Sequence, residues 1–135
     1  ILDKSGVVDT YGATQVLQDE LLAEADIISL HVPLTELTQG MVNEEFLQKM
    51  KPTAYLINNS RGPVVNQKAL KNALQEKIIA GAALDVFESE PPDDIEFLDL
   101  PNLMVTPHIG GSANEAILAM GRSAISHLNR HFQNV

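Results

Sequence analysis

Two side chains at the ends of apolar runs have the chemistry for proton transfer on an anionic substrate. Arg61 follows the run at residues 54–58, where a guanidinium can bind a carboxylate through two parallel hydrogen bonds. His108 follows the run at residues 103–106, and an imidazole can donate or accept a proton near neutral pH. Considered singly, Arg61 is equally explained as a surface residue paired with a carboxylate. His108 is equally explained as a histidine that is hydrogen-bonded near a helix start.

A glutamate close to His108 would support proton transfer. Glu88 and Glu90 both follow the segment Asp85-Val86-Phe87. A carboxylate that binds the second ring nitrogen of a histidine fixes its tautomer and keeps the imidazole able to act as an acid. The spacing alone does not choose between the two glutamates.

His127 and His131 are four residues apart on one face of a predicted helix, a spacing that can chelate a metal ion. The zinc-protease pattern, with glutamate directly after the first histidine, is absent because Leu128 follows His127. Histidines near a helix C-terminus also interact favourably with the helix dipole. We therefore expect no metal site.

Short apolar runs that alternate with helical segments must position these side chains. The runs lack a clean alternation of polar and apolar residues, which is typical of strands covered on both faces. Strand–helix–strand order with short links predicts a parallel sheet. We predict an α/β fold with strands at 27–32, 54–58, 79–86 and 103–106, and helices at 17–25, 43–50, 66–76 and from 112 to near the C-terminus.

Two further segments have local signatures. Ser112 and Glu115 are three residues apart before an apolar helical stripe, which predicts a capping box at the start of the last helix. Residues 88–101 are rich in proline and acidic residues, which predicts a loop whose carboxylates are mostly solvated.

Polar residues follow all four predicted strands. An open parallel sheet binds ligands beyond the carboxyl ends of its strands, so these residues predict one shared site. They are His31, Asn58, Asn59, Ser60, Arg61, Asp85 and His108, and Pro33 stands beside His31 at the end of the first strand.

The composition excludes several function classes. The chain has 135 residues, 9 Lys and Arg against 18 Asp and Glu, a net charge of −9 and no cysteine. This acidity argues against nucleic acid or an anionic membrane surface as a partner. The lack of cysteine excludes disulfides and thiolate chemistry and fits a reducing compartment. No apolar run reaches the roughly 18–20 residues that span a bilayer, and we expect a cytoplasmic domain.

Four segments stand in an order that resembles one enzyme family. They read ADIISLHVPLT (25–35), LINNSRG (56–62), GAALDVFESEP (81–91) and TPHIGG (106–111). Together they resemble the NAD-binding domain of the D-isomer-specific 2-hydroxyacid dehydrogenases, which include phosphoglycerate dehydrogenase and glyoxylate/hydroxypyruvate reductase. The resemblance covers nearly the whole chain. It implies a Rossmann-type, doubly wound parallel sheet with flanking helices, a homodimer, and NAD as cofactor.

The resemblance also implies roles for individual residues. Arg61 would bind the substrate carboxylate and carbonyl oxygen, and His108 would donate a proton to that oxygen as hydride arrives from the nicotinamide. Glu90 would support His108, because the family places this glutamate just before a proline. Asp85 would lie near the nicotinamide carboxamide, and Asp3 would bind the adenosine ribose. The implied cofactor-binding residues are Asp3, His31, Pro33, Asn59, Ser60, Arg61, Asp85, His108 and Gly110.

The sequence departs from the family in its phosphate-binding turn. No Gly-x-Gly-x-x-Gly occurs, so the first strand and the glycine-rich turn of a Rossmann unit are missing. We therefore interpret residues 1–135 as the C-terminal part of a NAD-binding domain, with the substrate domain absent.

The function predicted for the intact protein is hydride transfer between NAD(H) and a D-2-hydroxy acid or 2-keto acid, with little turnover by these 135 residues alone. Ile109-Gly110-Gly111 after the histidine favours the phosphoglycerate and glyoxylate branches over the D-lactate branch. Two alternatives are a NADH-sensing, corepressor-like protein of the same fold and an inert truncated product.

Overall fold

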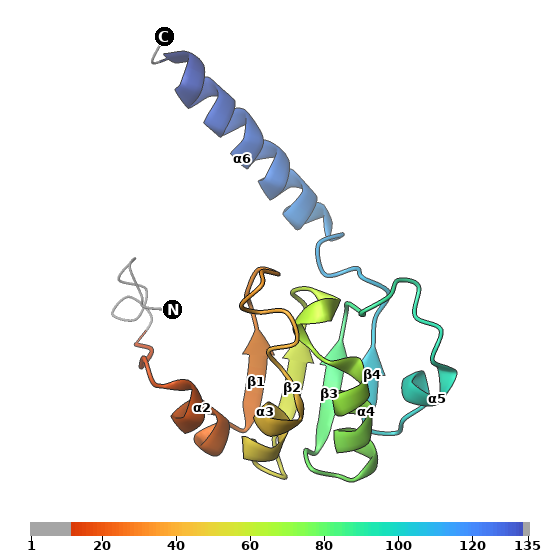
Figure 1. The fold of residues 1–135 in the computed structure, drawn as a ribbon. Helices are drawn as coiled ribbons and strands as arrows, with labels where there is room; N and C mark the ends of the chain where they lie inside the picture. Colours follow the sequence, from red (N-terminus) through yellow and green to blue (C-terminus); the bar gives the residue numbers. More distant parts are fainter. Residues whose placement is uncertain (1–11, 134–135) are drawn as a thin grey trace.

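The predicted apolar runs form one fully parallel sheet in the computed structural model, which describes residues 12–133. The strands are hydrogen-bonded in chain order, β1-β2-β3-β4, with Leu56 opposite both Ile28 and Ala82 (Figure 1). The predicted parallel α/β fold is confirmed. The strands are β1 (Ile27–Leu30), β2 (Tyr55–Asn58), β3 (Gly81–Leu84) and β4 (Leu103–Val105).

All four strands are shorter than the runs that predicted them, and β1 and β3 lose the most residues. The ladder between β1 and β2 ends at the pair Leu30 and Asn58, and the ladder between β2 and β3 ends at Asn58 and Leu84. Residues 31–32 and 85–86 therefore leave the sheet, although Val86 is still buried. An apolar loop residue that packs on the core has the same local pattern as a strand residue, which is why both predictions were too long.

All four predicted helices form, and asparagine side chains cap two of them. Asn43 accepts a hydrogen bond from the backbone nitrogen of Phe46, and Asn66 accepts one from that of Ala69. Each bond satisfies an amide of the first helical turn that has no partner within the helix. The helices are α2 (Gln18–Glu24), α3 (Glu44–Lys49), α4 (Gln67–Gln75), α5 (Ile95–Leu98) and α6 (Asn114–Gln133), with a 3-10 turn η1 at Gly62–Val64.

The cap at Asn66 gives a stability prediction. Asn66→Ala should lower the free energy of unfolding by about 1 kcal/mol, because the Ala69 amide loses its acceptor. Asn66→Asp keeps an acceptor and adds negative charge at the helix N-terminus, so it should retain the parent stability. Urea unfolding of the three proteins measures both effects. Equal losses in the two variants would contradict a capping role.

The acidic segment at 88–101 is more ordered than predicted. It contains α5, whose N-cap Asp94 accepts from the backbone nitrogen of Phe97. The Lys71 ammonium donates to Asp94 at 3.0 Å and to Glu96 at 2.7 Å, so these carboxylates are paired rather than merely solvated. The bonds to Glu96 and Asp94 raise the pKa of Lys71, and the bond from Lys71 lowers the pKa of Asp94. Sequence spacing missed this contact because Lys71 lies on α4.

The predicted capping box at Ser112 does not form. Helix α6 begins at Asn114, which puts Ala113 at the N-cap position. Ser112 instead closes a turn, its backbone nitrogen donating to the carbonyl oxygen of Ile109. Ser112 is therefore one residue too early to cap the helix.

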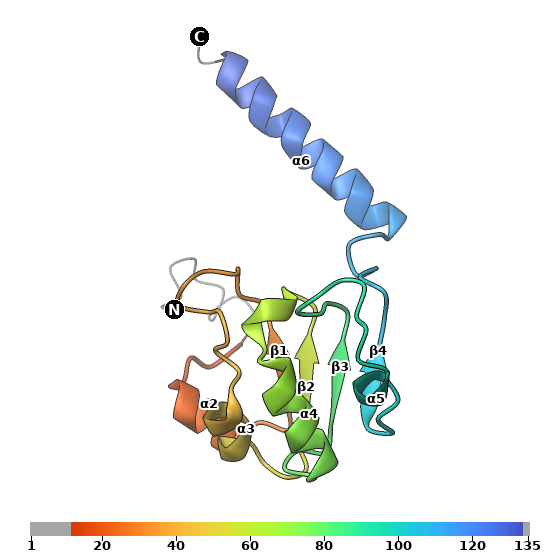
Figure 2. The same cartoon turned by 45° about the vertical axis from the view of Figure 1, so that its right-hand side comes forward.

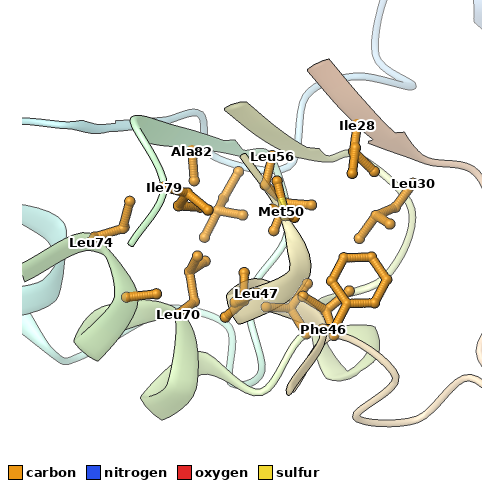
Figure 3. Packing of buried hydrophobic residues seen from close by; sticks show 14 of the residues in the cluster. Ile28, Leu30, Phe46, Leu47, Met50, Leu56, Leu70, Leu74, Ile79 and Ala82 are labelled. Atoms are coloured by element: carbon orange, nitrogen blue, oxygen red, sulfur yellow. The ribbon is translucent and has the colours of Figure 1, made fainter. Parts of the chain in front are cut away.

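Within residues 12–133, helices cover one face of the sheet, whereas the lack of alternation predicted cover on both faces. Figures 1 and 2 show α3, α4 and α5 on the same side of the strands. In β1 and β2, Ile28 and Leu56 are buried while Ile27 and Tyr55 are exposed. The continuous apolar runs therefore conceal an alternating burial pattern. Figure 3 shows the core between strands and helices, which includes Ile28, Leu30, Phe46, Leu47, Met50, Leu56, Leu70, Leu74, Ile79 and Ala82.

Helix α6 extends away from the sheet in both views (Figures 1 and 2). The predicted apolar stripe is present along it, and its large side chains are exposed. They include Ile117, Met120, Ile125, Leu128 and Phe132. Of the helices described, α6 included, none combines the length and the apolar character needed to cross a membrane.

Candidate active site

The loops that carry the predicted site residues start from neighbouring strand ends. The backbone nitrogen of Asp85, after β3, donates to the carbonyl oxygen of Asn58 at 3.0 Å. The nitrogen of Thr106, after β4, donates to the carbonyl oxygen of Leu84 at 2.9 Å. Because the strands are parallel, their carboxyl ends share one edge of the sheet. The strand ends that carry the predicted residues therefore lie along one edge of the sheet.

Asn58 anchors the loop that carries Arg61. Its side chain is buried and accepts from the backbone nitrogen of Ser60 at 3.1 Å and from the Ser60 hydroxyl at 2.9 Å, while its amide donates to the carbonyl oxygen of Arg61 at 3.1 Å. The sequence predicts Asn58 only at the strand end and does not indicate this role. An asparagine directly before a polar turn is the signal that could have indicated it.

Arg61 faces solvent beside a polar groove at the ends of β1 and β2. Its guanidinium donates to the carbonyl oxygen of Ser60 at 2.6 Å. His31, on the β1 side of the groove, shares a 2.9 Å hydrogen bond with the Ser29 hydroxyl. The groove has a volume of about 520 Å³ and is lined by His31, Val32, Pro33, Leu34, Asn59, Ser60 and Arg61.

His108 and Glu90 form a hydrogen-bonded pair on the β3 and β4 side. Nδ1 of His108 lies 2.8 Å from one carboxylate oxygen of Glu90, and the other oxygen accepts from the backbone nitrogen of Phe87 at 3.0 Å. The bond from His108, followed by that from Phe87, lowers the pKa of Glu90. Glu88 is exposed. The geometry thus pairs Glu90 with the histidine, which the spacing alone could not decide.

Asp85 holds the turn around His108 rather than facing the groove. One of its oxygens accepts from the Thr106 hydroxyl and from the backbone nitrogen of Ile109, and the other accepts from the backbone nitrogen of Gly110 at 2.8 Å. Desolvation raises the pKa of Asp85, but these hydrogen bonds outweigh it and hold the pKa below its usual value.

The low pKa values of Asp85, Glu90 and Asp94 predict a loss of stability in acid. Each depressed pKa adds stability that is fully present above the unfolded pKa of about 4. That stability is lost as the pH falls through the folded pKa. We expect the free energy of unfolding to fall below about pH 5, and to fall less steeply in Glu90→Gln. Urea unfolding at stepped pH measures the slopes, and identical slopes would contradict the assignment.

The predicted residues therefore form two groups. His31, Pro33, Asn59, Ser60 and Arg61 line the groove, whereas Asp85, Glu90, His108 and Gly110 are joined by hydrogen bonds. Within residues 12–133, no hydrogen bond or ion pair joins Arg61 to Glu90 or His108. The groups meet through the backbone, because Gly62 packs directly on the carbonyl of Phe87.

An apolar hollow of about 310 Å³ lies beside His108 and Glu90. Among the side chains that line it are Phe87, Leu98 and Val105.

Asp3 lies outside the described residues. In the part of the chain that the structure describes, no three His, Asp or Glu side chains gather in a way that could hold a metal ion.

The family is shown by a match to a protein-family model. Residues 2–110 match the NAD binding domain of D-isomer specific 2-hydroxyacid dehydrogenases. The chain belongs to this family. The resemblance noted in the sequence is confirmed, and the four-stranded sheet is part of the family's Rossmann-type fold.

Relatives within the 2-hydroxyacid dehydrogenase family include enzymes named for glyoxylate. Glyoxylate/hydroxypyruvate reductase B of Enterobacter agglomerans is 50% identical over 82% of this chain and 34% of its own length. The crystal structure of a glyoxylate reductase from Paecilomyes thermophila is 34% identical, with a TM-score of 0.85 over 96% of this chain and 39% of that one. The chain spans about a third of the length of the curated relatives it matches.

The dehydrogenase family supplies the cofactor assignment. A Lactobacillus delbrueckii ssp. bulgaricus 2-hydroxyacid dehydrogenase, whose structure is in the NAD complexed form, is 36% identical with a TM-score of 0.76 over 86% of this chain and 39% of that one. In the present structure, the Asn59 amide, the Ser60 hydroxyl and the His31 imidazole line the groove. These polar groups fit the ribose or carboxamide groups of NAD. No glycine-rich phosphate turn occurs in the chain, so its residues fit part of the cofactor.

Proposed function

We propose that residues 1–135 form the C-terminal part of the NAD-binding domain of an enzyme that reduces 2-keto acids to D-2-hydroxy acids. The observation that carries this proposal is the bond between Nδ1 of His108 and Glu90. With Nδ1 engaged, Nε2 is the ring nitrogen left for a substrate, and within residues 12–133 it has no hydrogen-bond partner. Such a histidine is oriented for general acid–base catalysis.

His108 would give a proton from Nε2 to the substrate carbonyl oxygen, and it would remove that proton in the reverse reaction. Glu90 would keep the tautomer that has its other proton on Nδ1 and would stabilise the imidazolium. Arg61 would bind the substrate carboxylate with a forked pair of charge-assisted hydrogen bonds. The cofactor, when bound, supplies or accepts the hydride.

His31, Asn59 and Ser60 are proposed to hold part of NAD along the groove. Pro33 would shape the wall of the groove, and Gly110 would let the backbone approach the cofactor closely. Arg61 would lie where the groove passes to the substrate. The adenosine ribose would be bound by Asp3.

The names of the relatives support a proposal for the substrate class. The curated relatives include proteins named glyoxylate/hydroxypyruvate reductase and glyoxylate reductase. We propose that this protein reduces a small 2-keto acid of that kind, with glyoxylate and hydroxypyruvate as the first compounds to test. An exposed guanidinium beside the groove is consistent with a small anionic substrate.

We also propose that the protein forms a homodimer. The exposed apolar side chains of α6 and of the uncovered sheet face support this, since large apolar patches commonly mark interaction surfaces. Sedimentation velocity should give twice the mass of one chain, and a monomer at micromolar concentration would contradict it.

The catalytic proposal is tested with the intact protein, NADH and each keto acid, by following NADH absorbance. We expect His108→Asn to lower kcat by about 10²–10⁴-fold. His127→Asn, on exposed α6, is the matched control and should leave kcat unchanged. NADH binding without turnover would instead support a NADH-sensing protein, and the absence of both would support an inert product.

A further inference from the structure

We infer that Asp85 is a positioning residue that sets the backbone and imidazole of His108 for proton transfer. The catalytic purpose of this role rests on the proposed function. It differs from the role that the family resemblance implies, in which Asp85 lies against the nicotinamide carboxamide.

Asp85 binds three donors, which lie on both sides of His108 in the sequence. The Thr106 hydroxyl lies two residues before His108, and the backbone nitrogens of Ile109 and Gly110 lie one and two residues after it. One carboxylate therefore clamps the turn from both sides of the histidine. Both of its oxygens bind the turn, one with two donors and the other with one.

The backbone of His108 has an unusual conformation. Its φ is 54°, in the left-handed region that residues with a side chain rarely adopt. Such a conformation persists only where surrounding contacts impose it. The hydrogen bonds to Asp85 fix the amides directly after this residue. They thereby direct the ring so that Nδ1 lies 2.8 Å from Glu90.

Asp85 is itself anchored to the sheet. It directly follows β3, and its backbone nitrogen donates to the carbonyl oxygen of Asn58 in β2 at 3.0 Å. The clamp is thus built on the rigid sheet and not on another loop. The fit is tight, because a Cβ added to Gly110 would lie 2.9 Å from the Asp85 carboxylate. Glycine at this position allows the backbone to approach the carboxylate.

The test replaces Asp85 and reads the imidazole of His108 directly by long-range ¹H–¹⁵N NMR on the full chain. In Asp85→Asn, we expect the His108 ring signals to move toward those of Glu90→Gln, because Nδ1 loses its aligned acceptor. Asp99→Asn removes a charge from an exposed aspartate and should leave the signals unchanged. Unchanged His108 signals in Asp85→Asn would overturn the inference.

A milder variant protects the test against misfolding. Thr106→Val removes one of the bonds to Asp85 and leaves the carboxylate in place, so it should move the ring signals in the same direction by a smaller amount. Thr106→Ser keeps the hydroxyl and should restore the parent spectrum. Equal spectra for the valine and serine variants would overturn the proposed clamp.

Kinetics of the intact protein separate positioning from cofactor contact. Asp85→Asn should lower kcat about 10- to 100-fold, the loss usual when an outer partner of a metal-binding histidine is removed, with the KM for NADH unchanged. A raised KM for NADH with unchanged His108 signals would overturn the inference in favour of cofactor contact. An inactive parent protein would refute the proposed function, whereas the NMR comparison would still decide the positioning role.

Discussion

Gly62→Ala should destabilise the domain by about 3 kcal/mol or more, the upper range for overpacking a dense interior. A Cβ at Gly62 would lie 1.8 Å from the carbonyl oxygen of Phe87 and 2.6 Å from the backbone nitrogen of Glu88. Both are backbone atoms, so no change of side-chain rotamer relieves the clash. The loop that carries Arg61 would have to move away from the segment that leads to Glu90.

Gly111→Ala is the matched control, because a Cβ at Gly111 would meet no atom within 4 Å. Its effect should stay within about 0.5 kcal/mol, as for most surface substitutions. Urea unfolding compares the two variants with the parent. Equal unfolding free energies for both alanine variants would show that the loop with Gly62 does not contact the backbone of Phe87 and Glu88.

Arg61→Ala should raise the KM for the keto acid about 100-fold or more in the intact protein, with NADH affinity nearly retained. A hydrogen bond to a charged group contributes about 1.5–3 kcal/mol, and each 1.4 kcal/mol is tenfold in affinity. Loss of a forked pair therefore exceeds two orders of magnitude. Arg61→Lys should recover only part of the loss, because an ammonium cannot form the forked pair.

Steady-state kinetics with the keto acid and NADH varied in turn separate the two binding constants. Arg122→Ala removes an exposed arginine of α6 and should leave both constants unchanged. If Arg61→Ala raised the KM for NADH and not that for the keto acid, Arg61 would belong to the cofactor site alone.

The sequence by itself determined the four strands, the helices other than α5, their order and the family. Short apolar runs between amphipathic segments specify a parallel α/β sheet, because burial follows the local period of the chain. Asparagine at the start of a helix specifies a cap for the same local reason, and Asn43 and Asn66 both form one. The four motifs were sufficient for the family because each lies within about a dozen residues.

Only the tertiary structure decided which partners these residues have. Glu90 and His108 are 18 residues apart, and Asp85 and Gly110 are 25 apart, so no local pattern fixes their distances. Contacts between distant residues also explain two predictions that were wrong. The pairing of Lys71 with Asp94 ordered a segment predicted to be a solvated loop. Likewise, the covered face of the sheet depended on where the crossing helices packed, because an apolar run specifies burial but not the element that provides it.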